Sequence, residues 1–271
     1  MSIFSSQVGT TPNRVEMFIN FMRNNKKFLT KKDIKELFSP KEESTAFDNV
    51  FSFCNTFKLI TIESDVVFFN GDNKKATKDI IFDAIFTNDV ENDNFVNVVT
   101  WFTCLGKNDL FTYNDNVGGS GKIQNDTNQY INESLSPAPW QNLIYWLEYF
   151  GFATKLQVKN ETIIIPDSTI AIKNKLNTLF QKDKTYAISD FFIKLSSLIP
   201  VLEYSKNKEK LYHHLREGLK ITADTFFLSS SLALLKLEKT GCLELIAKPD
   251  SDVMILELRR VSHIKFLGLK D

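Results

Sequence analysis

The sequence predicts an α+β chain that is mainly helical, and three observations support this fold class. Apolar residues recur at intervals of three and four over most of the chain, as on one face of an α-helix. Three times, such a segment is followed by two short apolar stretches separated by turn-forming residues, the pattern of a β-hairpin. The apolar content of 43%, with 24 phenylalanines, provides enough material for more than one core.

Residues 12–70 show this order most clearly. Short helices are predicted over 12–23, 30–38 and 44–57, and the second has a threonine at its N-cap position. The pattern then changes to KLITIE and VVFFN, two strands joined by a Ser-Asp turn. Three helices followed by a hairpin is the order of a winged helix, a variant of the helix-turn-helix.

The end of this unit occurs twice more, because residues 139–167 and 225–258 each contain a helix, a glycine and two predicted strands. The glycines are Gly151 and Gly241, and Lys58 occupies the matching position of the first unit. A glycine at this position permits the positive φ that turns the chain from a helix into the first strand. The sequence therefore predicts three tandem winged-helix units, at residues 1–75, 76–166 and 167–271.

Further helices are predicted over 77–88 and 93–105 in the second unit and over 168–180 in the third. An Asn- and Gly-rich loop, residues 106–135, precedes the last helix of the second unit and contains NVGGSGKI. A phosphate-binding loop of the form G-x-x-x-x-G-K-[ST] would place a glycine at Asn116 and a Mg²⁺ ligand at Ile123. Both are missing, so the loop is interpreted as exposed, poorly ordered chain, and no cofactor is expected.

Side chains suited to catalysis or metal binding are sparse. Glu209, His213 and Glu217 share one helical face, but such a stripe is usually a salt-linked surface. His213 and His214 are neighbours and therefore cannot readily share one metal. The three cysteines lie far apart in apolar stretches, which suggests neither a disulfide framework nor a zinc site. The chain is expected not to be an enzyme, and an NTP-using or metal-dependent activity is the least favoured class.

A winged helix that reads DNA usually presents Lys and Arg on its third helix and wing, because phosphate neutralisation supplies most of the affinity. The predicted third helices at 44–57 and 139–150 contain no Lys or Arg, and the last sets Lys236 and Lys239 against Glu238. The whole chain balances 33 basic against 33 acidic residues. Reading of duplex DNA by the third helices is therefore not expected.

Basic residues concentrate instead at two places outside these helices. One is the stretch RNNKK with the KK that follows it, and the other is RRVSHIK, interpreted as a basic tail after the last wing strand. The residues predicted to contact nucleic acid are Arg23, Lys26, Lys27, Lys31, Lys32, Arg259, Arg260 and Lys265. Contact with double-stranded DNA is expected to be weak.

No apolar run approaches the length needed to cross a bilayer, and the N-terminus lacks the basic-then-apolar pattern of a signal peptide. The chain is therefore predicted to be cytoplasmic, with no membrane partner.

The segment SPAPWQNLIYWLEYFGFATKL, followed by IIIPDSTIAI, resembles proteins of the DpdG kind. These are accessory components encoded in bacterial clusters that insert 7-deazaguanine derivatives into DNA and restrict foreign DNA. The likeness is carried by Trp140, Trp146, Leu147, Gly151 and Phe152, and then by Pro166, Asp167, Ser168 and Thr169. These are structural positions, so no catalytic residue is carried over. The resemblance implies a non-enzymatic member of an antiviral defence complex.

Tandem winged helices with weak basic character fit an adaptor or scaffold in a DNA-directed complex, for defence or associated with the chromosome. The expected partners are protein subunits of a multi-component complex, with an ATPase or a nuclease as candidates. The alternative is a transcriptional regulator that binds DNA directly.

Overall fold

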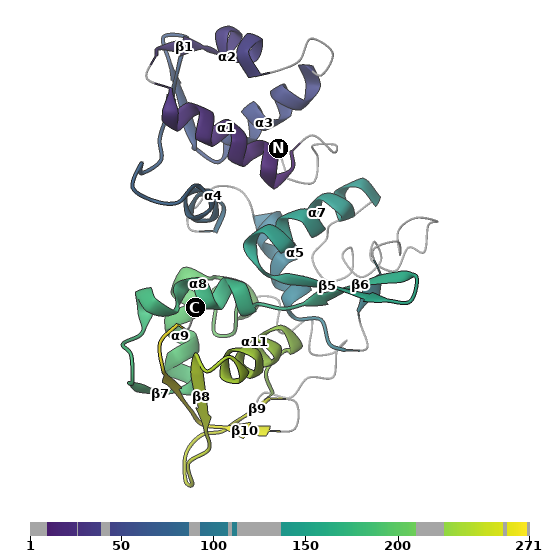
Figure 1. The fold of residues 1–271 in the computed structure, drawn as a ribbon, viewed down its shortest axis with the longest axis vertical. Helices are drawn as coiled ribbons and strands as arrows, with labels where there is room; N and C mark the ends of the chain where they lie inside the picture. The colour runs from purple at the N-terminus through teal and green to yellow at the C-terminus, as the bar shows by residue number, and fades with distance from the viewer. Residues whose placement is uncertain are drawn as a thin grey trace. The chain divides into compact units, whose positions relative to one another are not determined.

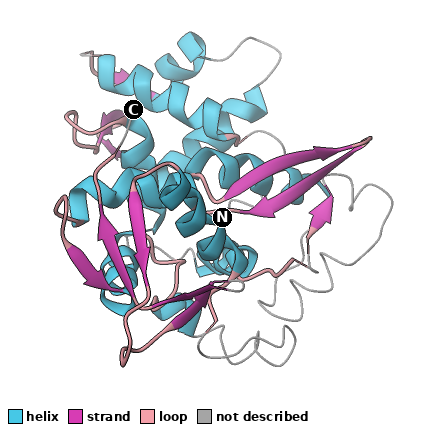
Figure 2. Ribbon diagram, turned by 60° about the horizontal axis from the view of Figure 1, so that its bottom comes forward, coloured by secondary structure: helices cyan, strands magenta, loops and turns pink. Residues whose placement is uncertain are grey.

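A computed structural model describes residues 10–25, 27–38, 44–86, 93–107, 110–112, 137–209, 225–256 and 259–269. It confirms the α+β class, because helices alternate with small antiparallel sheets along these residues (Figure 1, Figure 2). The chain forms two compact bodies. The N-terminal body comprises Met1–Phe95 with Leu135–Trp146, and the C-terminal body comprises Val96–Ser134 with Leu147–Asp271.

The N-terminal body contains the helices and the hairpin predicted for the start of the chain. Its elements in order are α1 (Pro12–Asn24), β1 (Leu29–Thr30), α2 (Lys31–Phe38), α3 (Ser44–Thr56), β2 (Ile60–Glu63), β3 (Val66–Phe69) and α4 (Thr77–Phe86). Strand β3 lies between β1 and β2 and is antiparallel to both, with Val67 opposite Leu29 and Ile62. Short strands and short helices are thus tied together by one small sheet.

Aromatic rings from α1 and α3 fill the core of this body. Phe18 is fully buried, and its ring meets the edges of Phe47 and Phe51 at centroid distances of 6.2 and 6.1 Å. Each such pair stabilises the fold by about 0.5–1.5 kcal/mol beyond the area that it buries. The start of α2 is fixed by a reciprocal cap, in which the Thr30 amide donates to Asp33 at 2.9 Å and the Asp33 amide donates to the Thr30 hydroxyl at 3.2 Å.

Two helices run from one body into the other, α5 (Asp93–Thr103) and α7 (Pro137–Phe150). The C-terminal body then contains β4 (Phe111–Thr112), β5 (Ala153–Val158), β6 (Glu161–Pro166), α8 (Thr169–Leu179), β7 (Thr185–Ala187), α9 (Ile188–Leu198), α11 (Leu228–Lys239), β8 (Leu243–Ile246), β9 (Met254–Leu256), β10 (Arg259–Val261) and β11 (His263–Phe266). The predicted second hairpin is confirmed as β5 and β6, the long pair of strands in Figure 2.

Three sheets of the described residues share one arrangement. Their strand orders are β1-β3-β2, β4-β6-β5 and β7-β11-β8, and every pairing in them is antiparallel. In each, a short strand that follows a helix lies at one edge, and the last strand of the segment lies in the middle. A further helix, α3, α7 or α11, precedes the strand at the other edge.

The three helices that precede these edge strands end in the same way. Lys58, Gly151 and Gly241 have positive φ angles of 54°, 81° and 71°. The amide of the next residue donates to the carbonyl five residues back, in the pairs Leu59–Cys54, Phe152–Leu147 and Cys242–Leu237, at 2.8, 2.7 and 2.9 Å. This is the Schellman arrangement of a helix C-terminus. The predicted equivalence of the three positions is confirmed.

The third predicted hairpin is wrong. Strand β8 pairs with β11, where Leu245 lies opposite Ile264, and β9 pairs with β10, where Ile255 lies opposite Arg260. Strands β9 and β10 form a separate hairpin within the segment that joins β8 to β11. Apolar alternation on both sides of KPDSD correctly indicated strands, but alternation does not specify which strand each one pairs with.

Candidate functional site

Arg23, the first residue predicted to contact nucleic acid, forms hydrogen bonds within the N-terminal body. Its guanidinium donates to the Thr77 hydroxyl at 2.5 Å and to the backbone carbonyls of Asn73 and Lys75 at 2.9 and 3.1 Å. The Thr77 hydroxyl in turn donates to Asn20 at 2.6 Å. Arg23 therefore holds the loop before α4 against α1, which is a structural role.

Lys31 is also engaged, by a carboxylate on α3. Its ammonium lies 3.1 Å from Asp48, which Lys35 contacts at 2.8 Å, and 4.9 Å from the centroid of the Phe51 ring. The hydrogen bond from Lys35 lowers the pKa of Asp48, and Lys31 adds to this effect against the opposing effect of burial. These contacts join α2 to α3.

Lys27 and Lys32 are exposed and make no ion pair with any residue that the structure describes. They flank β1, one before it and one in the first turn of α2. Lys26 lies outside the described residues. The cluster predicted around the end of the first helix is thus divided into engaged and exposed cations.

The predicted basic tail is wrong, because Arg259, Arg260 and Lys265 lie in strands β10 and β11 rather than in free chain. Arg259 forms an ion pair with Glu238 of α11 and donates to the carbonyl of Leu245 at 2.8 Å. Arg260 is exposed, and Lys265 is half-buried opposite Glu244 of β8. Among the described residues, Arg260 is the one of these three that is exposed and has no acidic residue as ion-pair or cross-strand partner.

The helices that precede the edge strands are largely covered. On α7 the side chains of Trp140, Leu143, Ile144, Trp146, Leu147 and Phe150 are all buried. Within the N-terminal body, the indole of Trp146 stacks on Phe53 of α3 at 5.3 Å and donates to the carbonyl of Thr10 at 3.1 Å. On α11 the small side chains of Ser229, Ser230 and Ser231 are buried. One face of α7 and one face of α11 are therefore used within the fold.

A buried carboxylate connects the end of β6 to two helices of the C-terminal body. Asp167, 5% exposed, accepts hydrogen bonds from the Thr169 amide at 3.0 Å and from the Thr154 hydroxyl at 2.8 Å. The ammonium of Lys236 on α11 lies 2.5 Å from the same carboxylate. Beside it, the hydroxyls of Ser168 and Ser229 are 2.6 Å apart. The Pro-Asp-Ser-Thr stretch is thus a packed joint between β6, α8 and α11.

Electrostatics explain why an ionised carboxylate is tolerated at this joint. Burial alone would raise the pKa of Asp167, but the hydrogen bonds from Lys236, Thr169 and Thr154 together lower it below its ordinary value. Asp167 also accepts from the Thr169 amide in the first turn of α8, where the helix dipole favours a negative charge. Folding therefore favours the ionised form of the carboxylate at this joint.

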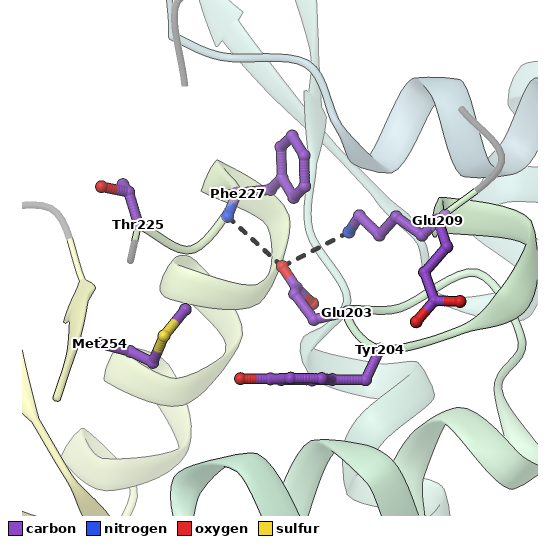
Figure 3. A pocket seen from close by; sticks show the side chains of 7 residues that line it. Glu203, Tyr204, Glu209, Thr225, Phe227 and Met254 are labelled. Atoms are coloured by element: carbon purple, nitrogen blue, oxygen red, sulfur yellow. Dashed lines mark hydrogen bonds and ion pairs between the residues drawn. The ribbon is translucent and has the colours of Figure 1, made fainter. Parts of the chain in front are cut away.

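A second buried charge lies in a pocket of about 180 Å³ beside the start of α11 (Figure 3). The carboxylate of Glu203 accepts hydrogen bonds from the Phe227 amide, at 3.3 Å, and from the Ser230 hydroxyl. Figure 3 shows the ring of Tyr204 below this carboxylate, with Met254 and Glu209 on opposite sides of the pocket. Because Phe227 is the N-cap of α11, Glu203 compensates the positive end of that helix.

Lys208 completes the group around Glu203. Its side chain is 3% exposed, and its ammonium lies 3.4 Å from the carboxylate and 4.2 Å from the centroid of the Phe227 ring. A separation of 3.4 Å is long for a hydrogen bond, and we interpret the contact as an electrostatic pair. Buried pairs of this kind fix a geometry more than they add net stability. One signal of this site is visible in the sequence, because an acidic residue directly follows the apolar run SLIPVL.

Two buried cysteines, Cys54 and Cys104, are not suited to act as nucleophiles. Burial raises the pKa of the Cys104 thiol to about 12, and it also raises the pKa of Cys54 strongly, so both remain protonated at neutral pH. No group of three His, Cys, Asp or Glu side chains within the described chain could hold a metal ion. Of the predicted acidic and histidine stripe, Glu209 lines the pocket, while His213, His214 and Glu217 lie outside the described residues. The glycine loop at 116–123 also lies outside them.

Comparison with known proteins shows the family. The DpdG-like family model matches residues 1–251, so the chain belongs to the DpdG-like family, as the resemblance around Trp140 and Gly151 suggested. This membership connects the chain with the multi-component Dpd modification system. No curated protein and no solved structure matches the chain. In the described part of the chain, every helix is too short or too polar to span a bilayer.

Proposed function

We propose that the chain is a non-enzymatic adaptor or scaffold subunit of the Dpd system, acting in the bacterial cytoplasm. We also propose that it is built from three tandem winged-helix units, at residues 1–75, 76–166 and 167–271. In a winged helix, a short strand follows the first helix and the last strand lies between it and the second strand. The orders β1-β3-β2, β4-β6-β5 and β7-β11-β8 support this assignment, as does the shared helix exit at Lys58, Gly151 and Gly241.

One observation carries the choice of an adaptor over a reader of DNA. The third helices of the proposed units make contacts with other parts of the same chain. Helices α3 and α7 pack together through Phe53 and Trp146, and Lys236 of α11 forms an ion pair with Asp167. A recognition helix needs an exposed face with cations to reach bases and phosphates in the major groove. Winged-helix units without such a face serve assembly better than sequence reading.

A transcriptional regulator is the alternative. The exposed cations Lys27, Lys32 and Arg260 favour it, since they could reach phosphates. They lie outside the third helices, however, so they would position the protein on DNA without reading a sequence. We therefore propose weak contact with double-stranded DNA as an accessory property of the adaptor.

Co-expression tests the adaptor proposal. The tagged chain would be produced together with the other proteins of its own Dpd cluster, treated with nuclease, and analysed by size-exclusion chromatography with light scattering. We expect a complex of defined stoichiometry that survives moderate salt, because assembly through apolar surface is not strongly screened. A chain that elutes with the mass of one copy, and instead selects a defined duplex from a random pool, would support the regulator.

A further inference from the structure

An unusual aromatic side chain lies at the edge of the first sheet. Phe28 directly precedes β1 and is 79% exposed, the highest value among the large apolar side chains that the structure describes. The register that pairs Leu29 with Val67 places Phe28 beside Phe68 of β3, and the two ring centroids are 6.1 Å apart at 66°. Val67 points the other way and is buried. Phe28 and Phe68 therefore share the outer face of the sheet.

This pair does not serve the core. Burying a phenylalanine stabilises a fold by about 1.5–3 kcal/mol, and Phe28 leaves most of that gain unused. A single exposed apolar residue is ordinary on a protein surface. Here, however, the edge-to-face contact with Phe68 holds an open ring in a fixed orientation on a sheet surface.

Two exposed lysines lie close to Phe28 in the sequence. Lys27 directly precedes Phe28 and Lys32 follows four residues later, and neither forms an ion pair within the described residues. The acids of this neighbourhood are either engaged or at its margin. Asp33 is held by Thr30, Asp48 by Lys31 and Lys35, and the exposed acids are Glu36 on α2 and Glu63 and Asp65 at the far end of the hairpin.

We propose that this surface, formed by Phe28, Phe68, Lys27 and Lys32, binds single-stranded nucleic acid. An unpaired base stacks on the open ring of Phe28, and Lys27 and Lys32 contact the flanking phosphates. Exposed aromatic rings beside cations are the usual means by which proteins hold single strands without sequence preference. A duplex cannot use the ring, because its bases are already stacked on one another. The inference rests on the proposed weak nucleic-acid contact: the lysines can meet the phosphates of a duplex or of a single strand, and the ring of Phe28 favours the single strand.

Fluorescence anisotropy with the full chain tests this proposal. The probes are a labelled oligothymidine of about 15 nucleotides, an abasic strand with the same phosphates, the uridine RNA equivalent and a duplex, at about 50 mM salt. We expect oligothymidine to bind about ten-fold more tightly than the abasic strand or the duplex. Phe28→Ala should remove this ten-fold advantage, whereas Phe28→Tyr should keep it and Leu37→Ala, another exposed apolar change in the same body, should have no effect. Oligouridine shows whether the strand is DNA or RNA.

Each contrary outcome is informative. Equal affinity for the abasic and the base-carrying strands, or an unchanged affinity in Phe28→Ala, would overturn the proposal. Loss of the co-expressed complex in Phe28→Ala with unchanged strand binding would assign the surface to a protein partner instead. Because complex formation is measured separately, failure of strand binding leaves the adaptor proposal intact. An unchanged melting temperature in Phe28→Ala shows that the variant is folded.

Discussion

The ammonium of Lys236 lies 2.5 Å from the carboxylate of Asp167, which connects the last turn of α11 to the end of β6. The same carboxylate accepts from the Thr154 hydroxyl at the start of β5 and from the Thr169 amide at the start of α8. One side chain therefore fixes a hairpin and two helices of the C-terminal body. A lysine that faces a DNA backbone would have to remain free, and Lys236 does not.

Breaking this joint should destabilise the C-terminal body. Asp167→Ala removes a buried acceptor of several hydrogen bonds and should lower the free energy of unfolding by about 3 kcal/mol. Lys236→Ala should cost only about 1 kcal/mol, because its ammonium is half exposed. Urea denaturation of the parent, both single variants and the double variant gives the coupling energy. A double variant equal to the sum of the two singles would show that the pair does not interact.

The joint should also fail in acid. The pKa of Asp167 is lowered in the folded chain, so its stabilising effect is fully present above about pH 4. It is lost as the pH falls from there through the folded-state pKa, because the unfolded chain binds the proton first. The difference in unfolding free energy between the parent and Asp167→Asn should therefore shrink between about pH 5 and 2. A difference that stays constant over this range would contradict the assignment.

Substitutions at two equivalent positions, Gly151 after α7 and Lys58 after α3, should change the stability of the fold in opposite directions. In Gly151→Ala the new Cβ would lie 2.6 Å from Cβ of Ile170, at a φ of +81°, so this change should cost about 3 kcal/mol or more. Lys58 adopts a φ of 54° without the freedom of glycine. Lys58→Gly relieves the strain of a positive φ but also gives the unfolded chain more conformational freedom. The net effect should be a free energy of unfolding that is higher by about 0.5 kcal/mol. Thermal melting of both variants checks the pair, and a destabilised Lys58→Gly would argue against equivalence.

Two adjacent arginines should differ in role. Arg259→Ala loses the contacts with Glu238 and the Leu245 carbonyl and should lower stability by about 1 kcal/mol. Arg260→Ala should leave the melting temperature unchanged, because this side chain is exposed. If the chain contacts phosphates here, Arg260→Ala should reduce the salt slope of DNA binding by about one unit. An unchanged slope would remove Arg260 from the proposed contacts.

Much of the fold was predictable because its signals are local. Apolar periodicity located α1, α3 and α7, and the turn at Ser64 and Asp65 located the first hairpin. Gly151 and Gly241 indicate a positive φ by their residue type, whereas Lys58 carries no such signal and its φ of 54° appears only in the structure. Strand β8 was paired incorrectly because its partner β11 is separated from it by the β9–β10 hairpin. Local alternation carries no information about such distant pairing.

The site was harder to predict, since composition does not show which charges are engaged. Arg23 and Lys27 look alike in sequence, yet the first binds three groups around Thr77 and the second is exposed. Asp167 was recognised as part of a resemblance, while its contact with Lys236 spans 69 positions and required the fold. The buried pair of Glu203 and Lys208 was missed for the same reason, because its role depends on where α11 begins.

The affinity of the full chain for duplex DNA tests most directly whether α3, α7 and α11, the third helices of the proposed units, are structural rather than recognition elements. At physiological salt we expect binding no tighter than about micromolar, with little difference between sequences in a random pool. Changing Gln141 and Tyr145 of α7 to Ala should alter neither the affinity nor the preference. Nanomolar binding to a selected sequence, lost in the Gln141 and Tyr145 variant, would contradict the account and make the middle unit the reader of DNA.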